Sequence, residues 1–388
     1  METIKNSLYS LINYCESCNF RGYDPYDTLN APVFKKVPGS FIPALLIQFQ
    51  KKNPVNIRPF LGIKKGHNPK AMGLFLKAYS LLFKKTQETR YLEKATHIFS
   101  WLKTNYSKGY SGYAWGYNFD WASPGSHLKA YTPSVVVTSF VIDGIFEYYK
   151  ATQNEQAKDV IISAAKFIRN DIPTTTFPEG ISFAYTQLST GACYNASLLA
   201  AEVLAKSAAL EGTIGHDELI EKAIRFVLSK QKADGSWYYS LNLETGKERR
   251  QIDFHQGFVL VSLYNLANLT GILKVEIEDA VKKGLKFYRE QQFFPNGRSM
   301  ARLPKKWPVD IHNQSQGIIT FSRLKEFDPD YGDFAKEIAL WTIQHMQGKK
   351  GYFYYRKTRF FTNKVPYMRW SQAWMMLALC ELLQNEDK

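Results

Sequence analysis

The stretch from His255 to Leu269 reads HQGFVLVSLYNLANL, in which a small or polar start precedes an apolar run of helical length. It contains no Asp, Glu, Lys or Arg, so a helix here is expected to be buried on all sides. Five further segments begin alike, each after a loop rich in Gly, Trp and Tyr. The six starts recur at nearly even steps along the chain and are marked by Pro69, Pro133, Asn195, Gln256, Gln316 and Gln372. Such a long period indicates a helical unit that buries its apolar face only by stacking on its neighbours.

An amphipathic segment follows each apolar one except the last. Ile277 and Val281, for example, lie among Glu278 and Lys282, which leaves one face of that segment in water. The expected outer helices are 88–105, 154–170, 215–231, 276–292 and 333–347, and a helix at 2–18 supplies a sixth that closes the ring. Residues 19–66 are expected to form an arm with one further helix near 41–51.

The sequence therefore predicts an all-α fold, an (α/α)6 toroid in which residues 1–388 form a single domain. An open solenoid of helix pairs is the alternative. In a solenoid the inner helices would face a solvated concave surface, and these helices are too apolar for that. No Ser/Pro-rich linker interrupts the repeat, which favours one domain over the two or three that this length allows.

The charge balance favours an anionic partner. Lys and Arg number 50 against 35 Asp and Glu, a net charge of +15. An acidic glycan, a phosphate-bearing substrate, a nucleic acid or a membrane surface would fit that charge. No cluster of five or more basic residues occurs, so no nucleic-acid partner is expected.

The chain offers no targeting or membrane-spanning pattern. The polar N-terminal helix lacks the apolar core of a signal peptide, and the longest apolar stretch, Val135 to Tyr148, contains Asp143. We expect a soluble, cytoplasmic protein without a transmembrane segment. Four Cys are too few for a disulfide framework, and Cys15 and Cys18 form a lone C-x-x-C pair that is expected to consist of buried thiols.

Long aromatic loops precede the inner helices, at 109–121, 177–185, 234–239 and 351–356, whereas the turns after these helices are short. This asymmetry predicts one working face, at the N-termini of the inner helices. Aromatic rings stack on the apolar faces of sugars while polar groups bind the hydroxyls, although about half of these rings are expected only to wedge loops between helices. The candidate substrate-binding residues are Asp24, Asp27, Trp115, Tyr117, Trp121, Tyr185, Asn195, Trp237, Gln256, Arg302, Gln316, Arg369 and Trp370.

Carboxylates and imidazoles recur at the same position of the repeat. The pattern Asp-x-His occurs at Asp253 and His255 and again, one repeat later, at Asp310 and His312. Together with Asp120, these four residues are the candidate catalytic groups, because Asp and His at a cavity rim act as general acids and bases. Each Asp is equally suited to capping a helix N-terminus. A two-Asp, two-His metal site has no recognised spacing here.

No motif for nucleotide binding, zinc proteolysis or serine hydrolysis appears, so neither a cofactor nor a metal is expected. The segment 231–237, QKADGSW, resembles the Q-x-x-D-G-S-W motif of terpene-cyclase and prenyltransferase toroids. The acidic catalytic motifs of those enzymes are absent, so the resemblance implies helix-pair architecture rather than isoprenoid chemistry. In this motif Gln231 and Trp237 are expected to tie an outer helix to the next loop.

Over most of its length the chain looks more like the sugar-active six-hairpin group. That group includes unsaturated glucuronyl hydrolases, N-acylglucosamine 2-epimerases and the toroidal domain of glucuronyl C5-epimerases. The resemblance lies in the repeat period and the loop chemistry. The arm motif GYDPYDTLN at 22–30 and the loop WGYNFDW at 115–121 also look like those of exopolysaccharide-locus proteins, which implies a role in making or trimming a surface glycan.

The leading hypothesis is an enzyme of a surface-polysaccharide pathway that hydrolyses an acidic or polar saccharide, with one Asp as general acid and another as base or nucleophile. A uronic-acid lyase or epimerase is the second, with a His or Tyr taking a proton next to the carboxylate. His255, His312, Asn195, Arg302 and Arg369 fit those parts. A glycan-binding protein without turnover and an isoprenoid- or lipid-carrier-binding toroid are further alternatives. The sequence leaves the sugar and the oligomeric state open.

Overall fold

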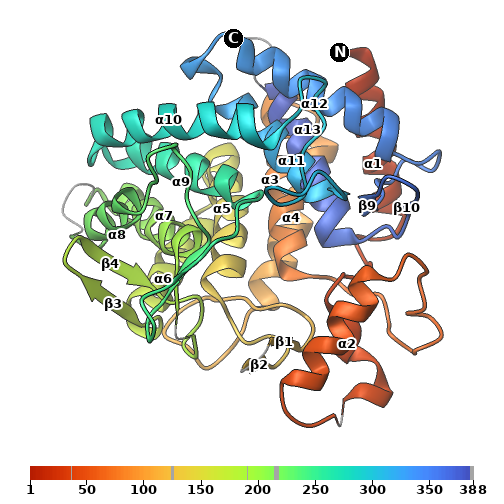
Figure 1. Ribbon diagram of the computed structural model, residues 1–388, viewed down its shortest axis with the longest axis horizontal. Helices are drawn as coiled ribbons and strands as arrows, with labels where there is room; N and C mark the ends of the chain where they lie inside the picture. The colour runs from red at the N-terminus through yellow and green to blue at the C-terminus, as the bar shows by residue number, and fades with distance from the viewer. Residues whose placement is uncertain (36, 124–125, 190, 214–217, 385–388) are drawn as a thin grey trace.

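Six helices that are buried on nearly every side line the inside of the protein in the computed structural model (Figure 1). The structure describes residues 1–35, 37–123, 126–189, 191–213 and 218–384. The inner helices are α3 (Pro69–Thr86), α5 (Val135–Thr152), α7 (Tyr194–Glu211), α9 (His255–Thr270), α11 (Ile311–Arg323) and α13 (Trp374–Gln384). Each packs against the next, and α13 packs against α3. The ring is therefore closed, which excludes the open solenoid.

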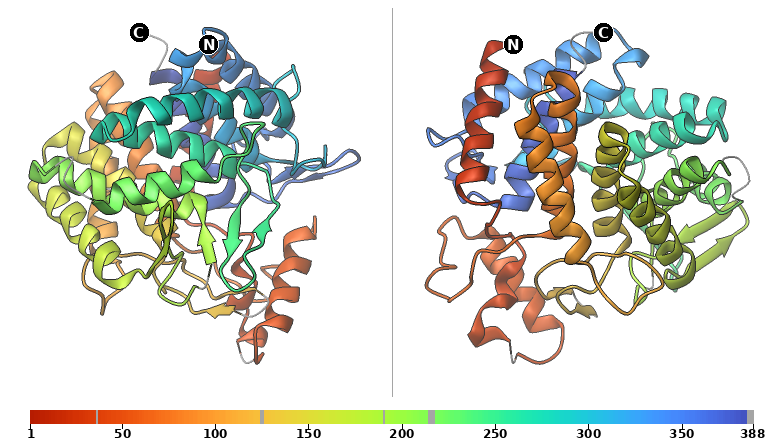
Figure 2. Two further views of the ribbon diagram at one scale, coloured as in Figure 1. Left: turned by 60° about the vertical axis from the view of Figure 1, so that its left-hand side comes forward. Right: turned by 180° about the vertical axis from the view of Figure 1, so that it is seen from behind.

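Amphipathic helices surround this ring, as the two further views show (Figure 2). They are α4 (Thr89–Thr104), α6 (Glu155–Asp171), α8 (Glu218–Ser229), α10 (Lys274–Gln292), α12 (Asp330–Met346) and, from the N-terminus, α1 (Glu2–Ser17). Because α1 packs against α12 and α13, it is the sixth outer helix. The predicted (α/α)6 toroid is confirmed, with helix bounds close to those expected. Residues 215–217 of the predicted helix 215–231 lie outside the described residues.

A repeated hydrogen bond fastens the loops to the inner helices. In five repeats a side chain near the start of the inner helix accepts from a backbone N–H of the preceding loop, at 2.7 to 3.2 Å. The accepting side chains are Thr138, Ser197, Gln256, Gln314 and Gln372, which are almost evenly spaced along the chain. The choice of Gln316 as the repeat marker was therefore wrong. Gln314 is the equivalent residue, and with it the period is nearly constant.

The predicted role of Gln231 and Trp237 is confirmed. Gln231, after α8, donates to the carbonyl of Ala280 in α10 at 2.8 Å, and the indole of Trp237 donates to Val227 in α8. The same device recurs where the ring closes. Gln347, after α12, donates to the carbonyl of Ser7 in α1 at 3.1 Å. These ties join neighbouring outer helices through partly buried polar groups whose hydrogen bonds are satisfied.

The long loops fold partly into short antiparallel strands, which the sequence did not predict. All of them precede inner helices and so lie on one face of the ring. They are β1 (Trp121–Ser123) with β2 (Ser126–Leu128), β3 (Thr174–Phe177) with β4 (Gly180–Phe183), β5 (Gly191–Cys193) with β6 (Ser240–Asn242) and β7 (Glu248–Arg249), and β8 (Val309–Asp310) with β9 (Arg356–Lys357) and β10 (Thr362–Asn363).

The arm projects from the ring on the same face (Figures 1 and 2). It contains two short 3-10 helices, η1 (Asp27–Asn30) and η2 (Pro32–Phe34), and helix α2 (Phe41–Lys52), which packs against η1 and β1. Its two ends are held together because Gly22 and Gly66 exchange backbone hydrogen bonds of 3.1 Å. The arm therefore leaves and re-enters the ring at one point, beside the N-terminus of α3.

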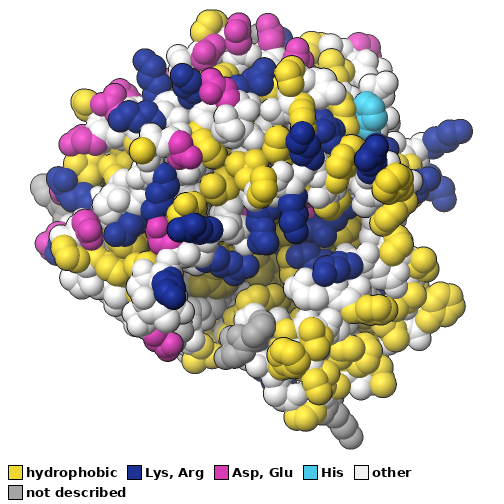
Figure 3. Space-filling model, in the orientation of Figure 1, with side chains coloured by type: hydrophobic (Ala, Val, Ile, Leu, Met, Phe, Trp, Pro, Cys, Tyr) yellow, Lys and Arg dark blue, Asp and Glu magenta, His cyan; other side chains and the backbone are white. Residues whose placement is uncertain are grey.

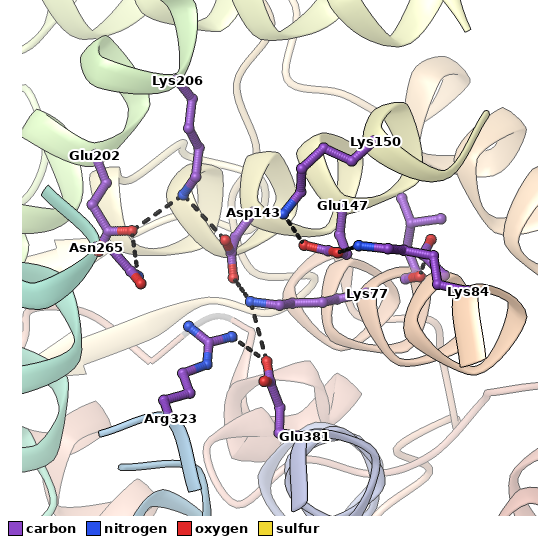
Figure 4. A network of polar contacts seen from close by, with 12 residues as sticks. Lys77, Lys84, Asp143, Glu147, Lys150, Glu202, Lys206, Asn265, Arg323 and Glu381 are labelled. Atoms are coloured by element: carbon purple, nitrogen blue, oxygen red, sulfur yellow. Dashed lines mark hydrogen bonds and ion pairs between the residues drawn. The ribbon is translucent and has the colours of Figure 1, made fainter. Parts of the chain in front are cut away.

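Between the inner helices, charged side chains form a connected network (Figure 4). Asp143 of α5 contacts Lys77 of α3 at 2.6 Å and Lys206 of α7 at 3.1 Å. Lys206 also contacts Glu202, which accepts from Asn265 of α9. Lys77 and Arg323 of α11 both contact Glu381 of α13. Every inner helix contributes a group to this network, which lies about 10–18 Å from the helix N-termini at a rise of about 1.5 Å per residue.

Candidate active site

Three aromatic rings from alternate inner helices form the floor of the site. Phe140 of α5, Phe258 of α9 and Trp374 of α13 contact one another with ring centroids 5.0 to 5.5 Å apart. All three are buried. They separate the closed ion network from the N-termini of the inner helices, where the aromatic loops converge.

Two buried polar side chains lie against this aromatic floor. The amine of Lys70, in the first turn of α3, is 4.1 Å from the centroid of the Phe140 ring and 5.2 Å from that of Trp374. His312, in the first turn of α11, contacts the rings of Trp374, Trp370 and Phe254 at 4.3 to 4.8 Å. Both side chains are almost fully buried.

In the described part of the chain, neither ring nitrogen of His312 has a hydrogen-bond partner. The amine of Lys70 forms no ion pair there and contacts only aromatic rings. Burial lowers the pKa of His312 well below its usual value, and the charge of Lys70 lowers it further, so this imidazole is neutral. Burial and then Arg369 likewise hold the pKa of Lys70 well below its usual range. A buried imidazole without a hydrogen bond and a buried amine without a counter-ion are both costly, so their presence together calls for a functional reason.

A hydrogen-bonded Asp–His pair lies next to His312. The Nδ1 atom of His255 is 2.6 Å from a carboxylate oxygen of Asp253, and both imidazoles contact the rings of Phe254 and Phe258. Burial opposes ionisation of Asp253, but His255 and hydrogen bonds hold the pKa of its carboxyl below the usual value. The anionic carboxylate accepts from Nδ1–H, which leaves Nε2 of His255 as a base. The ring is partly exposed, with 20% of its side chain accessible.

Asp310 occupies the equivalent repeat position but binds other partners. Its carboxylate accepts from the guanidinium of Arg356 at 2.6 Å and from the indole of Trp370 at 2.8 Å, and it caps α11 through the N–H of His312. The two Asp-x-His units are therefore not equivalent. Asp253 holds the ring of its own His, whereas Asp310 holds Arg356 and Trp370 and makes no bond to the ring of His312.

Both carboxylates of the arm motif are paired with arginines. Asp24 and Arg369 form a bidentate ion pair at 2.6 and 2.7 Å, and Asp27 contacts Arg58 at 2.6 Å. The first pair fastens the arm to the ring, and the second fastens it to the turn at Arg58, where the chain returns to the ring. Lys51 of α2 also reaches into the site. Burial lowers its pKa to about 8, and the neighbouring Arg356 adds to that effect.

A row of tyrosines completes the wall between the arm and the Asp253–His255 dyad. The guanidinium of Arg369 lies 4.8 Å from the ring centroid of Tyr117, which is hydrogen-bonded to Tyr185. Tyr239 contacts the ring of His255 at 4.7 Å. Nearby, Asn195 is buried and accepts from the thiol of Cys193. Phenol and amide groups of this kind bind sugar hydroxyls.

The face that carries these groups is hollowed. Figure 3 shows a recess with Lys and Arg side chains along one border and the apolar arm on the other. A small pocket reaches Asp253 and is lined also by Arg302 and Asn313. Arg302 donates to Gln251 at 3.0 Å, and Gln251 donates to Asp253 at 2.7 Å, so the exposed Arg302 is connected to the dyad.

Other predicted residues lie outside this cluster. The carboxylate of Asp120 accepts from Lys129 and from the N–H of Ala130, so its contacts stay beside the β1–β2 hairpin that also contains Trp121. The indole N–H groups of Trp115 and Trp237 donate to carbonyls of outer helices, and both rings are buried wedges.

The predicted glutamines are buried as well. Gln256 binds the backbone of the loop at Trp237, and Gln316 donates to Thr320 at 3.1 Å within its own helix. These residues shape the frame around the site rather than its wall.

Sequence reasoning missed the three cations Lys51, Lys70 and Arg356. A signal existed for Lys70, because a lysine directly after the helix start Asn68–Pro69 falls in a helix predicted to be buried. Lys51 and Arg356 gave none, because both belong to strongly basic segments that are typical of solvated surface. Among the described residues no group of three His, Cys, Asp or Glu side chains is placed to hold a metal ion.

The known proteins that this chain resembles are similar to it in structure. No protein-family model and no curated protein matches the sequence. An unsaturated glucuronyl hydrolase specific for heparin is similar in structure, with a TM-score of 0.65 and 11% identity over 100% of this chain and 96% of that one. A cellobiose 2-epimerase from Bacillus thermoamylovorans gives 0.61 and 15% over 82% and 87%. A family 76 α-mannanase from Bacteroides thetaiotaomicron gives 0.61 and 13%, also over 82% and 87%. At these identities the likeness establishes the toroid fold.

Proposed function

We propose that this protein is a carbohydrate-active enzyme that moves a proton at a carbon next to a carbonyl or carboxylate group of a sugar, as an epimerase, isomerase or lyase does. The observation that carries the proposal is the cluster on the aromatic floor. Within the described residues it joins a carboxylate-held imidazole, a neutral imidazole without a hydrogen-bond partner and a buried amine that contacts only aromatic rings. Aromatic rings and tyrosines around this cluster suit a pyranose.

Each step of this chemistry can be assigned to a side chain of the cluster. His255, held by Asp253, takes the proton through Nε2. His312, which also contacts Phe254, is a neutral hydrogen-bond donor, and the amine of Lys70 is a second donor to an enolate oxygen that develops there. His312 and Lys70 are buried, so a sugar must displace the side chains that cover them. Enzymes that exclude water from the reaction commonly rearrange side chains or loops in this way when the substrate binds.

Hydrolysis by two opposed carboxyls is the second candidate. Two of the three solved structures named above, the glucuronyl hydrolase and the α-mannanase, are hydrolases, which favours it. Against it, Asp24, Asp27 and Asp310 are each bound to an arginine, so among the described carboxylates of this cluster only Asp253 has no arginine on it. A glycosidase needs two carboxyls that face each other across the scissile bond. An anionic substrate, and a place in a surface-polysaccharide pathway, remain part of the proposal.

Hydrogen exchange at carbon tests the proposal. The wild-type protein is incubated in D2O with cellobiose, mannose and glucuronate, and proton NMR follows the signal of the hydrogen next to the carbonyl or carboxyl group. Proton transfer predicts loss of that signal in one of the sugars. Release of new reducing ends without exchange would establish the hydrolase instead. Tight binding of a sugar with neither change would favour a glycan-binding protein.

A further inference from the structure

Helix α2 of the arm turns an apolar face toward solvent. Phe41, Ile42, Leu45 and Phe49 are each more than half exposed, whereas Ala44 and Ile47 are buried. Residues three to four apart share one face of a helix, so the four exposed side chains form a single stripe. The opposite face of α2 carries Lys51, which contacts Tyr26, whose ring centroid lies 5.5 Å from that of Trp370 in the site. One face of the helix thus builds the site wall while the other remains uncovered.

The apolar surface continues beyond α2. The hairpin between β9 and β10 exposes Phe360 and Phe361 at its tip, and Phe360 is 88% exposed. This hairpin is fastened to the arm because the side chain of Asn363 donates to the carbonyl of Asn53, just after α2, at 3.0 Å. Figure 3 shows apolar side chains gathered over this corner of the molecule. We call these exposed side chains the apolar corner, which consists of Val33, Phe41, Ile42, Leu45, Phe49, Val55, Phe60, Phe360 and Phe361.

The charges around the apolar corner have one sign. Within residues 19–66 the only acidic residues are Asp24 and Asp27, and both are buried in ion pairs with arginines. The sequence has no acidic residue between Glu337 and Glu381, the segment that includes the hairpin. The exposed cations of the two segments include Lys35, Lys52, Lys64, Lys65, Arg359 and Lys364. The described residues of these two segments therefore expose apolar and cationic side chains and no carboxylate.

We propose that the apolar corner docks this enzyme onto a membrane surface that contains anionic lipids. Phenylalanine and leucine side chains partition into the boundary between headgroups and acyl chains, and lysines around them bind lipid phosphates. No helix in the described residues is long and apolar enough to cross a membrane, so this contact would be interfacial. A second copy of the chain is the competing occupant. Two such corners would bring cations of the same sign together, which disfavours that pairing.

The proposal does not depend on the sugar chemistry. If it holds, the recess opens beside the bilayer, because α2 supplies the site with Lys51 and the bilayer with its opposite face. That geometry suits a glycan attached to a membrane lipid or held at the membrane surface.

Vesicle sedimentation tests the proposal with the full chain. Phosphatidylcholine vesicles are compared with vesicles of phosphatidylcholine mixed with phosphatidylglycerol. We expect binding to the anionic vesicles only, weakened by salt, because both the apolar and the charged contribution are needed. The double variant Phe41→Ser, Phe49→Ser should lower the affinity by about tenfold or more. The matched control is Val275→Ser with Leu340→Ser, two exposed apolar residues on α10 and α12.

Circular dichroism and thermal unfolding of both double variants establish that they fold, since all four residues are exposed. Absence of binding to either vesicle overturns the proposal. Equal loss of binding in the control pair overturns the assignment to the apolar corner. A dimer in sedimentation velocity that Phe41→Ser, Phe49→Ser disrupts, without vesicle binding, would assign the surface to a second copy instead.

Discussion

The six inner helices carry buried polar groups at two levels, and the two levels differ in how these groups are satisfied. In the ion network of Figure 4, Asp143, Lys206 and Glu381 each have partners on neighbouring helices. At the N-terminal level, above the aromatic floor, Lys70 contacts only aromatic rings and has no ion pair, and the ring nitrogens of His312 have no hydrogen-bond partner, in the described part of the chain. Buried charge is tolerated in the first case because it is paired. In the second, the missing partner indicates a ligand.

The largest effect is expected at the dyad. His255→Ala should lower turnover by about 10²–10⁴-fold, because it removes the base, and should change the melting temperature little. His97→Ala, which removes an exposed imidazole from α4, is the control and should keep full activity. Steady-state kinetics on the sugar identified by hydrogen exchange measures both. Unchanged turnover in His255→Ala would show that another group is the base.

Asp253→Asn then separates the two roles of Asp253. As the partner of His255 it should reduce turnover strongly. As a helix cap alone its loss would cost about 0.5–2 kcal/mol of stability and spare the activity. Kinetics and thermal unfolding of the same preparation distinguish these cases. A destabilised but fully active variant would assign Asp253 to capping and remove it from the site.

Breaking the ion network of Figure 4 should lower the stability of the protein rather than its activity. Asp143→Asn leaves Lys77 and Lys206 buried without their shared carboxylate, and we expect a loss of about 3–5 kcal/mol in the free energy of unfolding. Glu221→Gln removes an exposed ion pair with Arg225 and should cost less than about 1 kcal/mol. Urea denaturation compares the two. Equal costs for both variants would show that the network carries no special weight.

A smaller effect is expected from pH on the groups at the N-terminal level of the inner helices. The pKa of Lys51 is lowered to about 8, so its amine is charged below that pH and neutral above it. The affinity for a carboxylated sugar should therefore fall as the pH rises through about 8, by about tenfold or about 1.4 kcal/mol. Calorimetric titrations on either side of that pH measure the change, and Lys51→Met should abolish it. A pH-independent affinity in the wild type would place Lys51 outside the binding site.

The fold could be predicted because it is periodic. Apolar runs such as 255–269 and amphipathic segments such as 276–292 alternate with a spacing that local residues reveal. The arm was also visible, since 19–66 falls outside the repeat. The short strands were not. Strand β5 pairs with β6, for example, although the whole helix pair of α7 and α8 lies between them in the chain, and a local pattern does not report such pairing.

The site was predicted less well because its residues are defined by distant partners. Asp253 and Asp310 have the same sequence pattern, and only the structure shows that Arg356 and Trp370 donate to the carboxylate of Asp310. Asp24 meets Arg369 from the other end of the chain. Lys70 differs, since its place in a buried helix was readable and only its lack of a partner required the structure.

Lys70 is buried without a counter-ion, and Lys70→Met tests most directly whether it is kept for an anionic ligand. The variant is compared with wild type by urea denaturation and by calorimetric titration with glucuronate and glucose. If Lys70 is kept for an anionic ligand, the variant should be as stable as wild type or more stable by about 1–3 kcal/mol, and it should lose the preference for glucuronate. A variant destabilised like Asp143→Asn that still prefers glucuronate would contradict the account.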